Sequence, residues 1–423
     1  MQLSKENTLI HSPARYQGRS QVKRLLLRCC LLALAGCQPA EPETAGEGKV
    51  AAEVEESGQV GLPWSGQVYG LLADDVNGDG QQDLLGVDHS KGMLQTFLQT
   101  APRQFQVGAA FDGVGFHPGT FFRWPGEPGQ YVLGAEGDSA VRSLRYTSAG
   151  QFEVLHNLPE RVPRYVRHFR WPGWGDSVVV SPYANGYVVL LKDYHPDTGL
   201  AKERVVVPLA ESPQTIRGAE KVTVADVDGD GIDELLLGIN TTNELMVIRH
   251  PAKPGKKPEA DVLLENNQWG TPNEAQVMDL DADGDNDLLL PDEAPPGKIR
   301  VFLNQGRGTF KPGKDIDFPL DGGVTELRIQ RDHDGRLIML AAGYGAIALY
   351  RFPEGWQDGQ PLERLHIDWP SEIARDLLLQ DIDGDGWLDG VLGRKSGKAR
   401  IWVVYGPLHE RFEQLSQHHF ELK

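Results

Sequence analysis

The chain has 423 residues, of which 40% are hydrophobic, so it is long enough to bury a substantial core as several domains or as one large repeat architecture. Its formal net charge of −18 argues against a phosphate-backbone partner, so we expect no nucleic-acid binding. The only three cysteines lie at positions 29, 30 and 37, so the chain beyond them has neither a disulfide framework nor a catalytic thiol.

Residues 1–36 have the features of an export signal. Basic residues, the last of them Arg28, precede a short apolar run that ends in Leu34-Ala35-Gly36-Cys37. This ending resembles a bacterial lipobox, and the resemblance implies that Cys37 becomes the first mature residue and carries a diacylglycerol. The alternatives are an ordinary cleaved signal or a buried helix, because the apolar run is short and Arg28 interrupts it.

Residues 37–60 are rich in Glu, Ala, Pro and Gly, a composition that cannot form a core, so we expect a flexible acidic tether. Gln38, rather than Asp, follows the cysteine. The lipobox resemblance then implies anchoring at the outer membrane of a bacterial cell envelope, facing the periplasm or the cell surface, through the N-terminal lipid only. A secreted protein is the alternative.

The rest of the chain, residues 61–423, consists of repeats of about fifty residues. Four repeats share one acidic template and begin at Asp75 (DVNGDGQQDLLGVD), Asp226, Asp279 and Asp381. Three others have the same apolar layout without a complete acidic loop, around Trp124, Trp171 and Asp332. We therefore predict seven units, at about 61–113, 114–161, 162–213, 214–268, 269–320, 321–370 and 371–423.

Each unit is predicted to hold four strands. In the fifth unit the runs EAQVMDL, DLLLP, KIRVFLN and TFKPGKDIDF are separated by an acidic loop and by turns rich in Gly and Pro. One small sheet cannot bury both of its faces, whereas radial packing of seven sheets can. The predicted fold is therefore all-β, a seven-bladed β-propeller of four-stranded blades. The final run, ERFEQLSQHHFEL, is expected to be the outer strand of the last blade, so that ring closure relies on face packing more than on strand exchange.

The acidic loops have the chemistry of a calcium site. Oxygen-bearing side chains stand at positions 1, 3, 5 and 9, and Gly at position 6 permits a tight turn. An EF-hand would need Glu at position 12, where Gly86, Leu237, Leu290 and Leu392 stand instead. A solvated acidic turn without metal is the alternative, but fifteen carboxylates this close together would repel one another without a counter-ion.

This pattern resembles the FG-GAP repeats of integrin-α chains and the bacterial VCBS repeats, over about residues 61–423. The resemblance implies about four structural Ca²⁺ ions. Its side-chain ligands would be Asp75, Asn77, Asp79 and Asp83; Asp226, Asp228, Asp230 and Glu234; Asp279, Asp281, Asp283 and Asp287; and Asp381, Asp383, Asp385 and Asp389. The backbone carbonyls at position 7 would complete the four sets, at Gln81, Ile232, Asp285 and Trp387. Magnesium fits poorly, because it requires strict octahedral geometry.

The sequence gives less on function than on fold. It contains no HExxH, GxSxG or phosphate-loop motif, and its twelve histidines form no cluster. A fold does not determine a function. The leading interpretation is a binding or interaction module for a protein or carbohydrate ligand. An enzyme is the weaker hypothesis, in the form of a carbohydrate-active enzyme such as a polysaccharide lyase, because some lyases use similar propellers.

Propellers commonly bind ligands on the face opposite the metal loops, where aromatic residues such as Phe116, His117 and Tyr344 are expected. Tyr183, Trp269 and Trp369 are the candidate ligand-binding residues on that face. The alternative is that each aromatic residue packs against its own loop.

The tetrapeptide Arg-Trp-Pro-Gly occurs at 123–126 and again at 170–173, in two units where a metal loop is missing. Either the tryptophan fills the space left by the ion, or the two copies form a basic-aromatic docking patch on the metal-loop face.

Overall fold

The structure is a computed structural model that describes residues 54–417, apart from 56–57, 65, 113, 115–117, 183–185, 210–218, 254, 266–268, 271, 320–321 and 395–399. The chain divides into two units, Met1–Gly48 and Lys49–Lys423, and all described residues belong to the second. The predicted export signal and Cys37 therefore lie outside the described residues.

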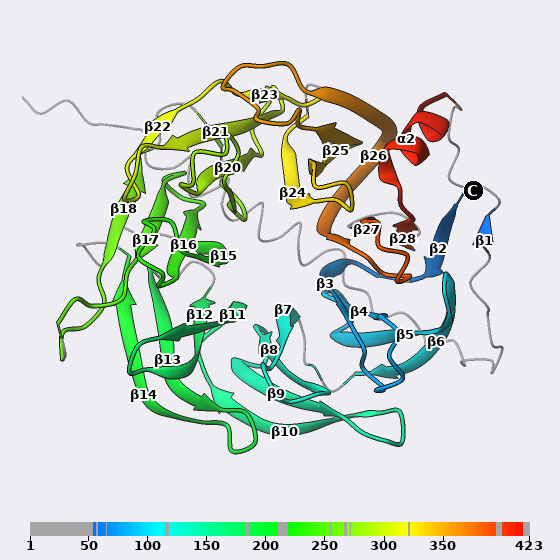
Figure 1. Cartoon of the computed structure of the whole chain (residues 1–423). Helices are drawn as coiled ribbons and strands as arrows, with labels where there is room; N and C mark the ends of the chain where they lie inside the picture. The colour runs from blue at the N-terminus through cyan, green and yellow to red at the C-terminus, as the bar shows by residue number, and fades with distance from the viewer. Residues whose placement is uncertain are drawn as a thin grey trace, which may run out of the picture. The chain divides into compact units, whose positions relative to one another are not determined.

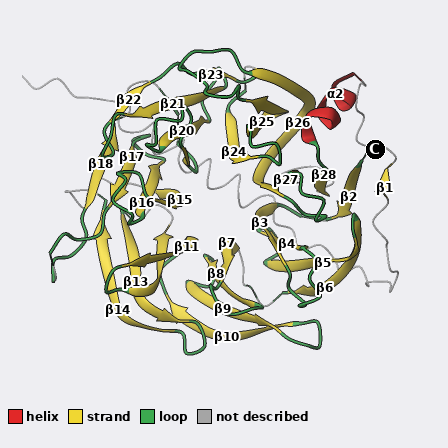
Figure 2. Ribbon diagram, viewed as in Figure 1, coloured by secondary structure: helices red, strands yellow, loops and turns green. Residues whose placement is uncertain are grey.

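Seven antiparallel blades form a ring, so the predicted seven-bladed β-propeller is confirmed (Figure 1). In the first blades the strands follow chain order from the middle of the ring outward, as from β3 (Val68–Asp74) to β6 (Gln104–Phe111). Almost all of the described structure is strand or loop (Figure 2). Within the described part of the chain, no helix has both the length and the apolarity needed to cross a membrane.

The first four blades are regular. Blade 1 holds β3, β4 (Asp83–Asp88), β5 (Met93–Ala101) and β6. Blade 2 holds β7 (Pro118–Arg123), β8 (Gln130–Ala135), β9 (Ala140–Tyr146) and β10 (Phe152–Pro159). Blade 3 holds β11 (Pro163–Trp171), β12 (Gly175–Pro182), β13 (Tyr187–His195) and β14 (Leu200–Pro208). Blade 4 holds β15 (Ala219–Ala225), β16 (Glu234–Ile239), β17 (Leu245–Ile248) and β18 (Ala260–Leu264).

The last three blades carry irregularities. Blade 5 holds β19 (Gln276–Met278), β20 (Asp287–Asp292), β21 (Lys298–Asn304) and β22 (Phe310–Pro312), and β23 (Ile316–Asp317) also pairs with β21. Blade 6 holds β24 (Val324–Arg331), β25 (Leu337–Arg351) and the first part of β26 (Glu363–Gln380). Blade 7 holds the second part of β26, β27 (Asp389–Arg394), β28 (Arg400–Val404) and β2 (Gln59–Pro63), and β1 (Val54–Glu55) pairs with β2.

Two long strands explain why blades 6 and 7 form one continuous sheet. Residues 337–343 of β25 pair with β24, whereas residues 346–351 pair with β26, so β25 supplies both middle strands of blade 6. Its turn is at Gly345, whose φ of 82° favours glycine. β26 then runs without interruption from the outer edge of blade 6 to the inner edge of blade 7.

The burial pattern follows from the ring. The second strands β4, β8, β16 and β20 are buried at every residue, because each is covered by a neighbouring blade on both sides. The outer strands β10 and β14 have many exposed positions. The core lies between blades: Trp171 and Val179 of blade 3, for example, pack with Leu235 and Met246 of blade 4.

Ring closure differs from the prediction. β2, from the N-terminal side of the propeller, pairs with β28 and supplies the outer strand of blade 7. Strand exchange therefore closes the ring, the first blade begins with β3 at Val68, and the tether predicted over 37–60 already contains β1 and the start of β2.

The predicted C-terminal strand is also wrong where the structure describes it, because residues 408–417 form the helix α2 (Leu408–Gln417). Leu408, Phe412 and Leu415 recur at helical spacing and are buried against Leu392 and Trp402. Because β2 already pairs with the free edge of β28, the C-terminal segment does not supply the outer strand of blade 7.

Candidate functional site

The four acidic loops leave the first strand of a blade and enter the second. They connect β3 to β4, β15 to β16, β19 to β20 and β26 to β27. They therefore share one face of the ring, the face at which the first strands end. Within each loop the glycine at position 6 has a positive φ, at Gly80, Gly231, Gly284 and Gly386. This confirms the turn that the sequence predicted.

The carboxylate at position 1 organises each loop by accepting backbone N–H groups. Asp75 accepts from Gly78 at 2.7 Å and from Gly80 at 2.9 Å, and Asp381 accepts from Gly384 and Gly386 at 2.8 and 2.9 Å. Asp226 accepts the two equivalent bonds from Gly229 and Gly231, whereas Asp279 accepts one, from Gly284 at 3.2 Å. The loops thus form closed turns with their oxygens brought together.

In three loops the carboxylates converge. Each set offers oxygens that lie within 4.8 Å of one another, and the sets are Asp226, Asp228 and Asp230; Asp279, Asp281 and Asp287; and Asp381, Asp383 and Asp385. In the first loop Asn77 stands at position 3 and donates to Asp79 at 3.1 Å.

The carboxylate at position 9 also accepts backbone hydrogen bonds, a role that the sequence did not predict. Asp83 is fully buried, and it accepts the N–H of Val76 at 3.1 Å and that of Gln99 on β5 at 2.7 Å. Asp389 does the same with Ile382 at 2.8 Å and Gly406 at 2.6 Å. In these two blades position 9 therefore ties the loop to the third strand or to the residues directly after it.

The loops fit a hard cation. In blade 5, Oδ1 of Asp279 and Oδ1 of Asp281 are buried and have no hydrogen-bond donor among the described residues. Burial, reinforced by the neighbouring carboxylates, raises the pKa of Asp83 and of Asp287 to about 6 and the pKa of Asp389 to about 7. A divalent cation would supply the missing positive charge and keep these groups ionised. The ligand role of the position-7 carbonyls stays a prediction.

Arginine side chains reach three of the blade corners, and in the blade 4 loop Nε of Arg249 lies 3.8 Å from Asp228. Arg103, in the turn between β5 and β6 of blade 1, pairs with Asp383 and, at 2.9 Å, with Asp385 of the blade 7 loop. In the incomplete loop of blade 6, Arg336 lies 3.5 Å and Arg351 lies 3.9 Å from Asp334. For Asp279, Asp281 and Asp283 of blade 5, no ion pair to a basic residue occurs within the described residues. Of the three loops with four acidic ligand side chains, only the blade 5 loop therefore has no arginine partner within the described residues.

The two Arg-Trp-Pro-Gly segments place their tryptophans inside the protein. Trp124 is buried and packs edge-on against His168 and Tyr194, at centroid distances of 5.4 and 5.7 Å. Trp171 is buried as well, and its Nε1 donates to the carbonyl of Asp233 at 2.7 Å. This arrangement favours the interpretation in which tryptophan fills the place of the ion over an exposed docking patch.

The predicted ligand-binding aromatics are only partly visible. Tyr183 lies outside the described residues, and so does the side chain of Trp369. Trp269 donates from Nε1 to the carbonyl of Asn243 at 2.7 Å and packs edge-on against Phe302 at 5.4 Å. Its side chain thus packs between β21 of blade 5 and the β16–β17 turn of blade 4.

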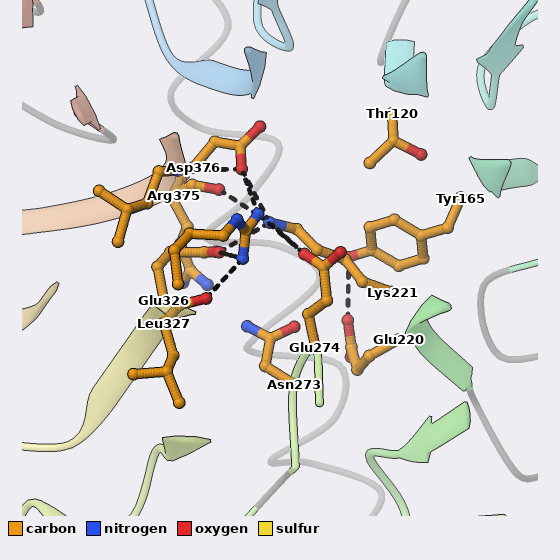
Figure 3. A network of polar contacts seen from close by, with 12 residues as sticks. Thr120, Tyr165, Glu220, Lys221, Asn273, Glu274, Glu326, Leu327, Arg375 and Asp376 are labelled. Atoms are coloured by element: carbon orange, nitrogen blue, oxygen red, sulfur yellow. Dashed lines mark hydrogen bonds and ion pairs between the residues drawn. The ribbon is translucent and has the colours of Figure 1, made fainter. Parts of the chain in front are cut away.

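A buried ionic network, which sequence reasoning missed, fills the middle of the ring (Figure 3). Nζ of Lys221 lies 2.8 Å from Glu326 and 3.3 Å from Asp376, and Arg328 lies 3.0 Å from Glu274. These residues come from the inner ends of different blades, and Asp376 also accepts the N–H of Leu71 on blade 1 at 2.6 Å. The sequence does contain a signal for this network, because the inner strands AEKVTVA and VTELRIQR carry charged residues within apolar runs.

The network sets opposite pKa shifts on two of its acids. Burial raises the pKa of Glu326 to about 7, because the charge of Lys221 is shared with Asp376. Burial would also raise the pKa of Glu274, but Arg328, Arg167 and Lys221 together hold it well below its ordinary value. The centre of the ring is therefore charged and internally paired.

Comparison with known proteins identifies a fold rather than a family. No protein-family model matches the chain, and no curated protein matches it by sequence. Solved structures do match. BBS1N, crystallised in complex with ARL6DN, has a TM-score of 0.53 and 11% identity, covering 82% of this chain and 98% of that chain. Sqt1 of Saccharomyces cerevisiae has a TM-score of 0.52 and 12% identity over 82% and 98%. A protein from Lactobacillus plantarum has a TM-score of 0.51 and 14% identity over 78% and 89%. At these identities the likeness shows the β-propeller alone.

Proposed function

We propose that this protein is a calcium-binding β-propeller that acts as a binding module at the bacterial cell envelope, with a protein or a carbohydrate as its ligand. The observation that carries the calcium part is the pair of buried, unpaired oxygens of Asp279 and Asp281 in a loop of converging carboxylates. Three further loops of the same FG-GAP/VCBS pattern stand in register with it around the ring.

Calcium has a structural role in this proposal. Each ion neutralises carboxylates at the corner of one blade and thereby holds the first and second strands together. With millimolar calcium and dissociation constants of ~0.1–1 mM, each site contributes about 0.4–1.4 kcal/mol to the free energy of unfolding. The opposite face, where the blades connect, is then free for a ligand.

Two considerations support the binding role. The fold is one in which a solved propeller, BBS1N, forms a complex with another protein, ARL6DN. In addition, most of the charged groups described in the middle of the ring are engaged with one another rather than arranged as a nucleophile and its base. A binding surface is therefore favoured over a catalytic centre.

The envelope location rests on the sequence of residues 1–37. In this proposal Cys37 carries the lipid, the following residues form a tether that ends near β1, and the lipid is the only contact with the membrane. Lipidation at an outer membrane is the location that Gln38 supports, and secretion without a lipid is the alternative.

Thermal unfolding in calcium, in magnesium and in chelator tests the proposal. Chelation should lower the melting temperature, and magnesium should restore little of the loss. Asp281→Asn should abolish part of the calcium-dependent gain, whereas Asp334→Asn in the incomplete loop of blade 6 is the matched control and should leave that gain unchanged. Identical melting curves with calcium and with chelator would refute calcium binding.

A further inference from the structure

A polar cavity of about 230 Å³ lies on the axis of the ring, beside the buried ionic network. It is lined from six blades, by residues at the start of the first strands, such as Tyr69 of β3 and Tyr165 of β11, and by Glu293 after β20. The acidic loops follow the ends of the same first strands. The cavity therefore opens toward the face opposite the metal loops.

One buried side chain in this cavity has an acceptor atom without a donor. Asn273 is only 6% exposed, and its Nδ2 donates to the carbonyl of Thr325 at 2.9 Å. That bond fixes the orientation of the amide and leaves Oδ1, which has no donor among the described residues. A buried acceptor of this kind is costly unless a donor is supplied from outside the protein.

A donor without an acceptor stands in the same cavity. Nε of Arg375 is buried and has no hydrogen-bond partner among the described residues, although Nη1 of the same side chain lies 3.6 Å from Glu293. Asn273 and Arg375 line the cavity together with Tyr165 and Glu220. A hydroxyl group satisfies both needs, since it donates to Oδ1 of Asn273 and accepts from Nε of Arg375.

Most charged groups of the lining are engaged in contacts within the protein, which disfavours an ionic ligand. Arg164 pairs with Glu136 at 2.6 Å, and Lys221 pairs with Glu326 at 2.8 Å. Glu220 accepts the hydroxyl of Tyr165 at 2.9 Å. A charged ligand would have to compete with one of these internal pairs, whereas an uncharged ligand leaves them intact.

The size and polarity of the cavity restrict the class of ligand further. Most ligand pockets are larger, roughly 300–1,000 Å³, and lined mainly by apolar groups. This cavity is smaller, and its lining is almost wholly polar. It has room for roughly seven waters at ~30 Å³ each, and a ligand that displaces them must reproduce their hydrogen bonds. Hydroxyl groups do so.

We propose that this axial cavity binds a small, uncharged, polyhydroxylated molecule of monosaccharide size. The inference deepens the proposed function, since it names a ligand class for the face opposite the metal loops. It rests on the propeller being a binding module but on none of the calcium ligands.

The test uses the full chain in saturating calcium, titrated with neutral hexoses and hexitols and, as charged counterparts, with glucuronate and glucosamine. Binding is followed by saturation-transfer NMR and by calorimetry. At least one neutral probe should bind at least ten-fold more tightly than both charged counterparts. Failure of every neutral probe to bind, or tighter binding of a charged one, overturns the proposal.

Two variants place the binding in the cavity. Asn273→Ala removes the unpaired acceptor, and Arg375→Lys keeps the positive charge but loses the guanidinium donor, so each should weaken the neutral probe at least ten-fold. Arg170→Lys is the matched control, because Arg170 is 71% exposed, and it should bind as the parent does. If Asn273→Ala fails to fold, Arg375→Lys decides alone.

Unchanged affinity in the cavity variants overturns the proposal. Calcium titration separates the two ideas. Loss of sugar binding in the cavity variants, with unchanged calcium binding, supports the cavity. If the parent protein binds calcium but no neutral sugar, the cavity proposal fails and the calcium proposal stands.

Discussion

Leu62 of β2 lies directly opposite Ile401 of β28 in an antiparallel register, although the two residues stand near opposite ends of the described chain. Both side chains are fully buried in one cluster, together with Val391 and Val403. The N-terminal strand therefore holds the last blade in the ring, and the stability of the whole propeller depends on it.

We expect Leu62→Ala to destabilise the protein by about 2–5 kcal/mol, the range for truncating a buried leucine. Leu200→Ala is the matched control, because Leu200 is also in the outer strand of a blade but is 63% exposed, and it should change stability by only ~0.5 kcal/mol. Denaturant unfolding measures both values. Equal effects of the two substitutions would show that β2 does not secure the ring.

Arg103 should matter most when calcium is absent. Its guanidinium pairs with Asp383 and Asp385, so it neutralises part of the blade 7 loop, and a bound calcium ion would take over that task. Arg103→Ala should therefore lower the melting temperature more in chelator than in calcium, and it should raise the affinity of that loop for calcium several-fold. The reverse order of the two losses would contradict this role.

The axial network predicts a specific pH dependence. The pKa of Glu326 is raised to about 7 in the folded protein, above its ordinary value of 4.5, in the presence of Lys221, Asp376 and Arg328. Between these two values the folded state binds a proton that the unfolded state has released, so this group adds stability as the pH falls from about 7 toward 4.5 and withholds it above 7.

Glu326→Gln removes that linkage. Relative to the variant, the parent protein should therefore gain roughly 1–3 kcal/mol of unfolding free energy between pH 8 and pH 5. Denaturant unfolding of both proteins in saturating calcium, at the two pH values, gives the difference. A difference that is constant with pH would mean that Glu326 does not take up a proton in the folded state.

The anchor is tested at Cys37. The parent protein, expressed in a bacterial host, should partition with membranes, since an acyl chain contributes about 0.8 kcal/mol for each buried CH₂ group. Cys37→Ser should be soluble or unprocessed, and Cys30→Ser should behave as the parent does. Equal partitioning of the parent and Cys37→Ser would refute lipidation.

The sequence predicted what repeats locally. The strands, the seven blades and the left-handed glycines such as Gly80 and Gly284 follow from patterns within about fifty residues, and the structure confirms them. The pairing of β2 with β28 could not be predicted in this way, because register between distant segments has no local signature. The end of the chain was misassigned because Leu408, Phe412 and Leu415 are too few to outweigh the expectation of a fourth strand.

In the candidate site, too, local patterns were predicted and contacts between distant segments were not. The acidic residues of each loop were found because they recur at fixed spacing, whereas Arg103 reaches its loop from a different blade. The axial network was missed because its members come from different strands, where each lies among apolar residues. Only the closed ring brings Lys221, Glu326 and Asp376 into contact. Asn273 is likewise one polar residue in a connection, and only its burial and its unpaired Oδ1 mark it.

The most direct measurement for the central claim is a calorimetric titration of metal-free protein with calcium, repeated with magnesium and with the variant Asp281→Asn. The account predicts about four calcium ions per chain at dissociation constants of ~0.1–1 mM, much weaker binding of magnesium, and about three calcium ions in the variant. Absence of calcium binding, or a stoichiometry that Asp281→Asn leaves unchanged, would contradict it.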